Sequence, residues 1–119
     1  EPTIFGAVDP AAVIARDEIF GPVLSVIPFR SEAEVVSFAN GSIYGLGASI
    51  WTSDLDRAIR MSRAMHVGSV SINAVDHVDV RTPFGGVKQS GNGRDLSLHA
   101  FEKYCDLKTT WIALQGNGA

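Results

Sequence analysis

Apolar and polar positions in the first two thirds of the chain follow two alternating periods. Short runs that are apolar on both faces are typical of strands covered on two sides in a parallel sheet, and segments of period 3.6 are typical of helices. The pattern predicts strands and helices in strict alternation at residues 23–29, 31–40, 48–52, 53–65 and 67–73. It therefore indicates an α/β fold containing a parallel βαβαβ unit with right-handed crossovers.

The ends of the two predicted helices carry recognisable signals. Ser31 and Glu34 fit the capping box at the start of the first helix, and Asn40-Gly41 is predicted to end it. The second helix begins with acidic residues from Asp54 on, near the positive end of its dipole. Its predicted apolar stripe is Leu55, Ala58, Ile59, Ser62 and Met65, and its arginines, Arg57, Arg60 and Arg63, are expected to face solvent.

The predicted topology leaves one face of the sheet without a cover. If the strands follow one another in one direction, both helices pack on the same face. The remaining elements are few: a strand at Thr3–Phe5, a helix at about 95–105 and a final strand at 108–114. We therefore expect the rest of a longer chain, or a partner, to cover the other face.

Composition and charge narrow the classes of function. The 119 residues are 45% hydrophobic and 19% charged, which is typical of one globular domain. A net charge of -3 and scattered arginines predict no nucleic-acid role, and no apolar run is long enough to predict a membrane helix. The single cysteine suits a cytoplasmic location. A start at Glu1, without methionine, is interpreted as a piece of a larger protein.

Two loops are candidates for a ligand site. In the segment 17–23, Gly21-Pro22 fixes a turn that holds Glu18 and Phe20, although a core aromatic and a solvated carboxylate are the simpler interpretation. The loop 74–94 follows a strand end, where α/β sheets place ligands. Its glycines match neither a P-loop nor a dinucleotide fingerprint, so turns with positive φ angles are expected at Gly85, Gly86, Gly91 and Gly93.

Neither cysteine chemistry nor a metal site is predicted within the chain. Cys105 lies near the end of the last predicted helix, on a stripe with Leu98 and Phe101 and with no histidine beside it in sequence, so we reject it as a nucleophile. The histidines are too far apart to suggest a metal cluster.

Three stretches, in the same order, resemble the aldehyde dehydrogenase superfamily. The first is Glu18-Ile19-Phe20-Gly21-Pro22-Val23, the second runs from Tyr44 to Asn73, and the third is Pro83-Phe84-Gly85-Gly86-Val87-Lys88-Gln89-Ser90-Gly91 with Asn92-Gly93-Arg94. The resemblance covers nearly the whole chain, but only the last quarter or so of such an enzyme. It implies a C-terminal fragment whose catalytic cysteine, general-base glutamate and adenosine-binding fold lie upstream.

The resemblance also implies roles for individual residues. Glu18 would accept hydrogen bonds from the nicotinamide ribose of NAD or NADP, and Phe20 would pack near the nicotinamide ring. Phe84 would line the aldehyde tunnel, with Asn73 and Val75 as further substrate-site candidates. The intact enzyme would attack the aldehyde with a thiolate, pass hydride to NAD(P)+ and hydrolyse the thioester, so the fragment alone is expected to be inactive.

The domain organisation follows from the same resemblance. Residues 1–106 would belong to the catalytic domain, and 107–119 would form an oligomerisation arm in which the strand 108–114 pairs with a neighbouring subunit. The run from Ser90 to Ala100 is most similar to the γ-glutamyl-γ-aminobutyraldehyde type. The alternative is a non-catalytic binding or assembly module that keeps the arm and has no active site.

Overall fold

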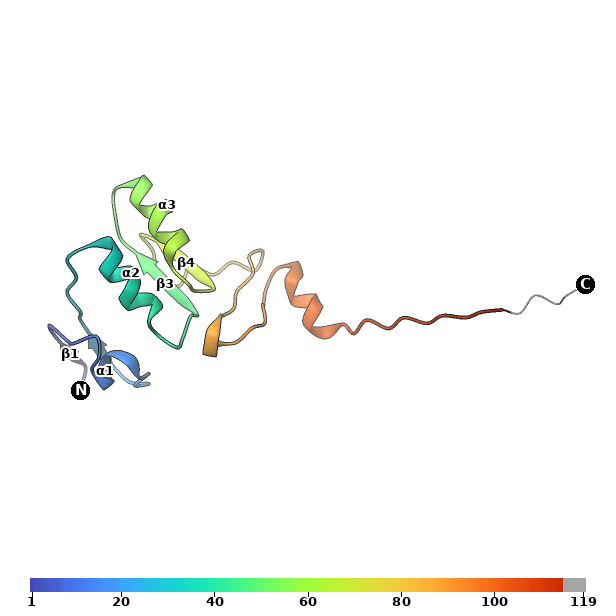
Figure 1. Ribbon diagram of the computed structural model, residues 1–119, viewed down its shortest axis with the longest axis horizontal. Helices are drawn as coiled ribbons and strands as arrows, with labels where there is room; N and C mark the ends of the chain where they lie inside the picture. The colour runs from blue at the N-terminus through green and yellow to red at the C-terminus, as the bar shows by residue number, and fades with distance from the viewer. Residues whose placement is uncertain (115–119) are drawn as a thin grey trace, which may run out of the picture.

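The computed structural model describes residues 1–114 and confirms an α/β fold with parallel strands (Figure 1). The strands and helices, in chain order, are β1 (Thr3–Phe5), α1 (Val13–Arg16), β2 (Val23–Ser25), α2 (Glu32–Asn40), β3 (Gly47–Ile50), α3 (Leu55–Ala64) and β4 (Ser69–Ile72), followed by 3-10 helices at Lys88–Ser90 and Leu98–Tyr104. The predicted strands 23–29, 48–52 and 67–73 are therefore present, as β2, β3 and β4, but each is shorter than the sequence indicates.

The strands pair as two separate parallel ribbons, which corrects the prediction of one continuous βαβαβ sheet. β1 pairs with β2, with Thr3 opposite Val23, and β3 pairs with β4, with Gly47 opposite Ser69. No β2–β3 pairing occurs within the described residues. Only the β3–α3–β4 part forms the expected βαβ crossover. Apolar periodicity identifies strands but does not say which strand lies beside which, and this explains the error.

Helix α2 has the predicted ends. The Ser31 hydroxyl accepts a hydrogen bond from the backbone N–H of Glu34 at 3.2 Å, which satisfies a donor at the helix start. The Glu34 carboxylate turns back and accepts from the backbone N–H of Arg30 at 2.6 Å, one residue before the position that a capping box uses. The helix ends at Asn40, and Gly41 forms its C-cap.

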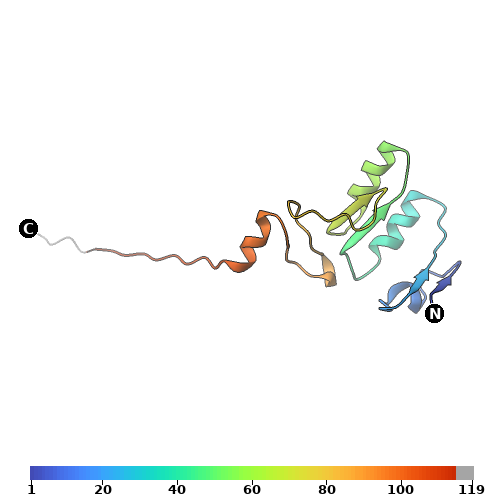
Figure 2. The same ribbon diagram turned by 180° about the vertical axis from the view of Figure 1, so that it is seen from behind.

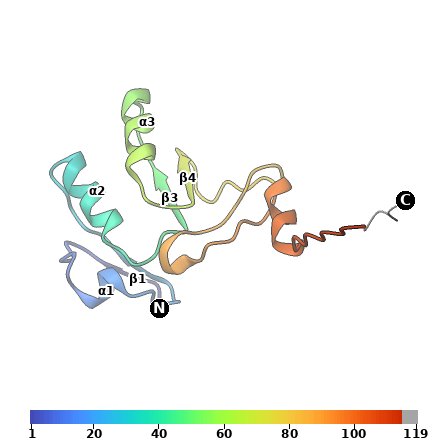
Figure 3. The same ribbon diagram turned by 45° about the vertical axis from the view of Figure 1, so that its right-hand side comes forward.

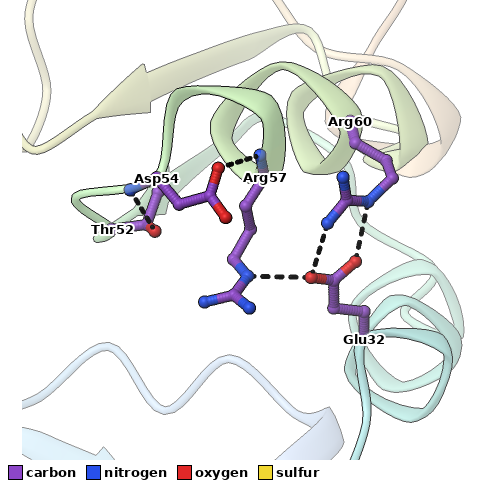
Figure 4. Close-up of polar contacts among 5 residues, drawn as sticks. All are labelled: Glu32, Thr52, Asp54, Arg57 and Arg60. Carbon is purple, nitrogen blue, oxygen red and sulfur yellow. Dashed lines mark hydrogen bonds and ion pairs between the residues drawn. The ribbon is translucent and has the colours of Figure 1, made fainter.

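Helix α3 differs from the prediction in its buried face. Its buried side chains are Ala58 and Met61, whereas Leu55 and Ile59 are exposed. The arginines are exposed, as predicted, and Arg57 and Arg60 also reach the carboxylate of Glu32 on α2 (Figure 4). The two helices lie in contact, and this ion-pair cluster joins their outer surfaces.

Within residues 1–114, Ala58 and Met61 are the only buried apolar side chains. Large apolar residues from almost every element are exposed, among them Ile4, Leu24, Phe29, Leu46, Trp51 and Ile72. Most of the apolar surface that the strands and helices create therefore lies open in this chain. This exposure agrees with the expectation that further material covers it.

The C-terminal part departs furthest from the prediction. The helix expected over 95–105 is a shorter 3-10 helix, and the segment 108–114 forms no strand within the described residues. It runs outward from the rest of the chain (Figures 1 and 2), and the Trp111 side chain is 93% exposed. A strand needs a neighbour for its backbone hydrogen bonds, and none is present here. The predicted arm extends to residue 119, and its last five residues lie outside the described part.

No helix in the described part is long and apolar enough to cross a membrane.

Candidate functional site

The loop between α1 and β2 presents Glu18 and Phe20 to solvent. Phe20 has a φ angle of 51°, a left-handed conformation that is uncommon for an aromatic residue, and its side chain is 90% exposed. The backbone is fixed after it, where the carbonyl of Pro22 accepts from the N–H of Thr3 at 2.9 Å. Glu18 is also exposed and makes no side-chain hydrogen bond to the described residues. Phe20 is therefore not a core aromatic in this chain.

Glu18 borders a cleft of about 600 Å³. The opposite walls come mainly from the connector between α2 and β3 and from the loop 83–91. Its lining residues are Ala39, Ser42, Tyr44, Gly45, Leu46, Gly47, Ala48, Met65, Val67, Gln89 and Ser90 together with Glu18. Glu18 is the one charged residue among them, so the cleft offers a single carboxylate in mostly apolar and neutral surroundings.

Asn73 closes the carboxyl end of the β3–β4 pair. Its Oδ1 accepts from the backbone N–H of Thr52 at 2.9 Å, and its Nδ2 donates to the carbonyl of Thr52 at 2.9 Å. Its own N–H donates to the carbonyl of Ile50, and its φ angle is 53°. Both groups of the Asn73 side-chain amide thus bond to the backbone of Thr52. This arrangement fixes the direction in which the following loop leaves the sheet.

Phe84 lies at a smaller hollow of about 290 Å³ that is also lined by β3. Its backbone is held by paired hydrogen bonds with Asp95, at 2.8 and 2.7 Å. The hollow is lined by Leu46, Gly47, Ala48, Ser49, Ser69, Ser71, Asp76, His77, Val78 and Phe84. The structure therefore brings Phe84 together with the loop 76–78. Asn73 and Val75 do not line this hollow, and Val75 is 65% exposed.

The Glu18 cleft and the Phe84 hollow share one wall. Leu46, Gly47 and Ala48 line both cavities, because the start of β3 runs between them. The loop 83–91 reaches both cavities, since Gln89 and Ser90 line the Glu18 cleft and Phe84 lines the hollow. Figure 3 shows the loop 83–91 turning back toward the end of α2 below this strand.

The glycines of the loop 83–91 act mainly through close packing, which corrects the prediction of positive φ angles. Gly91 alone has one, at 112°, and Gly85, Gly86 and Gly93 do not. A Cβ atom at Gly86 would lie 2.5 Å from the Cβ of Ser90, and one at Gly68, at the start of β4, would collide with the carbonyl of Gly85. Backbone segments approach each other here without room for a side chain.

Sequence reasoning missed Lys88, which anchors the same loop. Its Nζ donates to the backbone carbonyls of Asn40 and Ser42, at 2.9 Å each. The hydroxyl of Ser90 accepts from the N–H of Gly45 at 3.0 Å. No local signal reveals these contacts, because the partners lie more than forty residues apart: 48, 46 and 45 positions.

Cys105 follows the last 3-10 helix and is an exposed free thiol. Leu98 and Phe101, which were expected on its helical stripe, are also exposed, at 82% and 65%. Within residues 1–114, no group of histidine, cysteine and acidic side chains is arranged to hold a metal ion.

Fold and site together define an α/β protein that displays a free carboxylate at a cleft beside a parallel strand pair. The chain matches the model of the aldehyde dehydrogenase family over residues 1–110, and it belongs to that family. It is 59% identical to the NADP/NAD-dependent aldehyde dehydrogenase PuuC of Escherichia coli K12 over 96% of its length, and 43% identical to human mitochondrial aldehyde dehydrogenase over 94%.

Solved structures give the same result. The aldehyde dehydrogenase KauB from Pseudomonas aeruginosa superposes with a TM-score of 0.88 at 58% identity, covering 96% of this chain and 23% of that one. The P. syringae indole-3-acetaldehyde dehydrogenase AldA, solved with NAD+ and IAA, superposes with the same TM-score of 0.88 at 55% identity, over 96% of this chain and 23% of that chain. The chain thus spans 23% of the length of PuuC and of both these structures.

Proposed function

We propose that this chain is the C-terminal part of an NAD(P)-dependent aldehyde dehydrogenase that oxidises an aldehyde to a carboxylate. The observation that carries the proposal is the free Glu18 carboxylate at its cleft, with Phe20 beside it on the same loop. The family match covers residues 1–110 of this chain. The assignment of this chain to the C-terminal part of the enzyme rests on the order of the motifs from Glu18 to Arg94.

The residues at the cleft fit a nicotinamide cofactor. A carboxylate accepts two hydroxyl donors at once, as the vicinal hydroxyls of a ribose present them, and Glu18 has no competing partner in the described part. A volume of about 600 Å³ is within the usual range of small-molecule sites. The exposed ring of Phe20 would pack near the nicotinamide and exclude water. When bound, NAD(P)+ supplies the hydride acceptor.

At the smaller hollow, Phe84 would form the wall of the aldehyde site. Its backbone bonds to Asp95 fix the main chain at this position and leave the ring free to contact a substrate. For Asn73 we propose a role through the loop it directs, since Thr52 takes both groups of its amide. Val75 is exposed and would contact the substrate from that loop. The nucleophilic cysteine and the general base would come from the remainder of the enzyme.

For the substrate we propose the γ-glutamyl-γ-aminobutyraldehyde type. The resemblance in the run from Ser90 to Ala100 and the 59% identity to PuuC support this choice. AldA, whose name specifies indole-3-acetaldehyde, is 55% identical and provides the natural competitor. The two aldehydes differ in charge and shape, so comparing the rates at which the enzyme oxidises them distinguishes between the two candidate substrates.

The first test is sequencing of the coding region on both sides of this segment, followed by purification of the full-length product. We expect an upstream extension with a cysteine nucleophile, and aldehyde-dependent reduction of NAD(P)+ that is faster with γ-glutamyl-γ-aminobutyraldehyde than with indole-3-acetaldehyde. The reverse preference would overturn the substrate proposal. A full-length chain without the nucleophile and without activity would favour the assembly module.

We also propose that residues 1–106 belong to the catalytic domain and 107–119 to an oligomerisation arm. The segment 108–114 supports this proposal, because its backbone has no strand partner among residues 1–114 and its side chains Trp111, Ile112 and Leu114 are exposed. Deleting residues 109–119 from the full-length protein should lower its mass in light scattering. An unchanged mass would show that the arm is not needed for assembly.

A further inference from the structure

The loop 83–91 is attached to the end of α2 through the side chain of Lys88. Its ammonium group donates to the carbonyls of Asn40 and Ser42, at 2.9 Å each. Asn40 is the last residue of α2, and carbonyls at a helix end lack intrahelical partners. A cation is also favoured there by the helix dipole. Lys88 therefore fills a position that suits an ammonium group and that a neutral side chain would leave unsatisfied.

The backbone around Lys88 is held in an uncommon conformation. Lys88 has a φ angle of 55°, in the left-handed region. On either side of it, the N–H of Val87 donates to the carbonyl of Gly45 at 2.9 Å, and the N–H of Gln89 donates to Ile43 at 3.0 Å. A residue keeps such a conformation only where its surroundings enforce it, and such positions gather at functional sites.

Lys88 lies between the parts of the loop that reach the two cavities. Four residues before it, Phe84 lines the smaller hollow. Immediately after it, Gln89 and Ser90 line the Glu18 cleft. The connector that Lys88 and Ser90 bind, around Gly45, continues into the wall that the two cavities share. A shift of this loop against the connector would therefore change both cavities together.

We propose that Lys88 is a positioning residue that fixes the Phe84 wall and the Glu18 cleft relative to each other. The inference rests on the proposed function for the meaning of the two cavities. Beyond the proposed function, one side chain that contacts neither ligand controls the binding of both.

The test compares variants of the full-length enzyme. Lys88→Met keeps most of the length of the side chain and removes its donors, whereas Lys88→Arg keeps a cation that can donate to the same carbonyls. Ser90→Ala removes the acceptor for Gly45 and should have a weaker effect of the same kind. Arg63→Met is the matched control, because Arg63 is a cation in the last turn of α3 and is exposed.

For Lys88→Met we expect KM to rise for both the aldehyde and NAD(P)+, with kcat/KM reduced about tenfold. Lys88→Arg should recover most of the loss, and Arg63→Met should leave both KM values unchanged. A purely structural role would instead lower the amount of active enzyme, so that kcat falls and both KM values stay the same. That result would overturn the proposal. If Lys88→Met does not fold, the KM values of Ser90→Ala decide in the same way.

Hydrogen exchange separates this inference from the proposed function. The amides of Val87 and Gln89 should exchange about tenfold faster in Lys88→Met, whether or not the enzyme oxidises aldehydes. An inactive wild-type enzyme with this change in exchange would overturn the proposed function and leave Lys88 as the anchor of the loop. An active enzyme with unchanged exchange and KM would overturn the inference alone.

Discussion

The two loops at the candidate site are held in different ways. The loop 83–91 is bound to the α2–β3 connector by Lys88, by Ser90 and by backbone hydrogen bonds from Val87 and Gln89. The loop 17–22 is fixed only at its ends, and Glu18 and Phe20 extend from it without hydrogen bonds to the described residues. This chain alone thus shapes the first loop. The second displays side chains whose use depends on a ligand or on the rest of the enzyme.

The difference predicts that substitutions that disturb the packing of the first loop reduce stability, whereas those in the second loop affect binding alone. The largest effect is expected for Gly68→Ala. A Cβ at this position would lie 2.7 Å from the carbonyl carbon of Gly85 and would collide with its oxygen. Because backbone cannot yield as a side chain can, we expect a loss of about 3 kcal/mol in the free energy of unfolding.

Thermal unfolding of the full-length protein measures this effect. Gly6→Ala is the matched control, since a Cβ at Gly6 would meet nothing within 4 Å. The midpoint should fall in Gly68→Ala and stay near the wild-type value in Gly6→Ala. Equal midpoints in the two variants would mean that the loop 83–91 is not packed against β4 as described.

A smaller effect, confined to the cofactor, is expected for Glu18→Gln. The amide keeps the shape of the side chain but replaces a carboxylate that accepts charge-assisted hydrogen bonds, so KM for NAD(P)+ should rise about tenfold. The thermal midpoint should not change, because Glu18 is exposed and bonds to nothing in the described chain. Steady-state kinetics with NAD(P)+ varied at saturating aldehyde measures the change.

Asp17→Asn provides the control for Glu18→Gln. Asp17 is the adjacent carboxylate, is exposed, and does not line the Glu18 cleft. Its loss should leave KM for NAD(P)+ unchanged. If both variants raise KM equally, the charge of the loop as a whole would matter, and the specific role of Glu18 would be lost.

The same contrast explains how far the sequence could predict the fold and the site. The strands around Val23, Ala48 and Val70 and the ends of α2 depend on nearby residues, and the sequence located them correctly. The pairing of β2 with β1 depends on contacts between distant segments, and here the prediction was wrong. Lys88 was missed for the same reason, since its partners are 46 and 48 positions away.

The C-terminal elements failed for a different physical reason. Leu98 and Phe101 have the spacing of an apolar helical stripe, but both side chains are exposed. Most helical stability in proteins comes from packing of such a stripe, and without a surface to pack on the segment forms only a 3-10 helix. Trp111 likewise lies in a strand-forming sequence that has no neighbouring strand in the part of the chain that the structure describes. Both segments have the local sequence pattern of a helix or a strand, but within residues 1–114 neither has the neighbouring element on which it would pack.

The smallest effect is expected for Glu32→Gln, in the cluster that joins α2 and α3 away from both loops. The Glu32 carboxylate accepts hydrogen bonds from Arg60 and from Arg57, at 2.8 to 2.9 Å, and these lower its pKa from 4.5 to about 2 (Figure 4). A lowered carboxylate pKa means that the folded state favours the ionised form. The stabilisation is therefore fully present above about pH 4.5 and is lost as the pH falls toward 2.

Because all three side chains are partly exposed, water and salt weaken the cluster, and the change in thermal midpoint at pH 7 should be slight. The midpoints of wild type and Glu32→Gln should converge as the pH is lowered from 4.5 toward 2, and also as salt is raised at neutral pH. Asp56→Asn removes the same charge from the first turn of α3 without breaking these ion pairs, so its midpoint should not show this convergence. A difference between wild type and Glu32→Gln that persists at high salt would mean that Glu32 stabilises the helix pair by packing and not by charge.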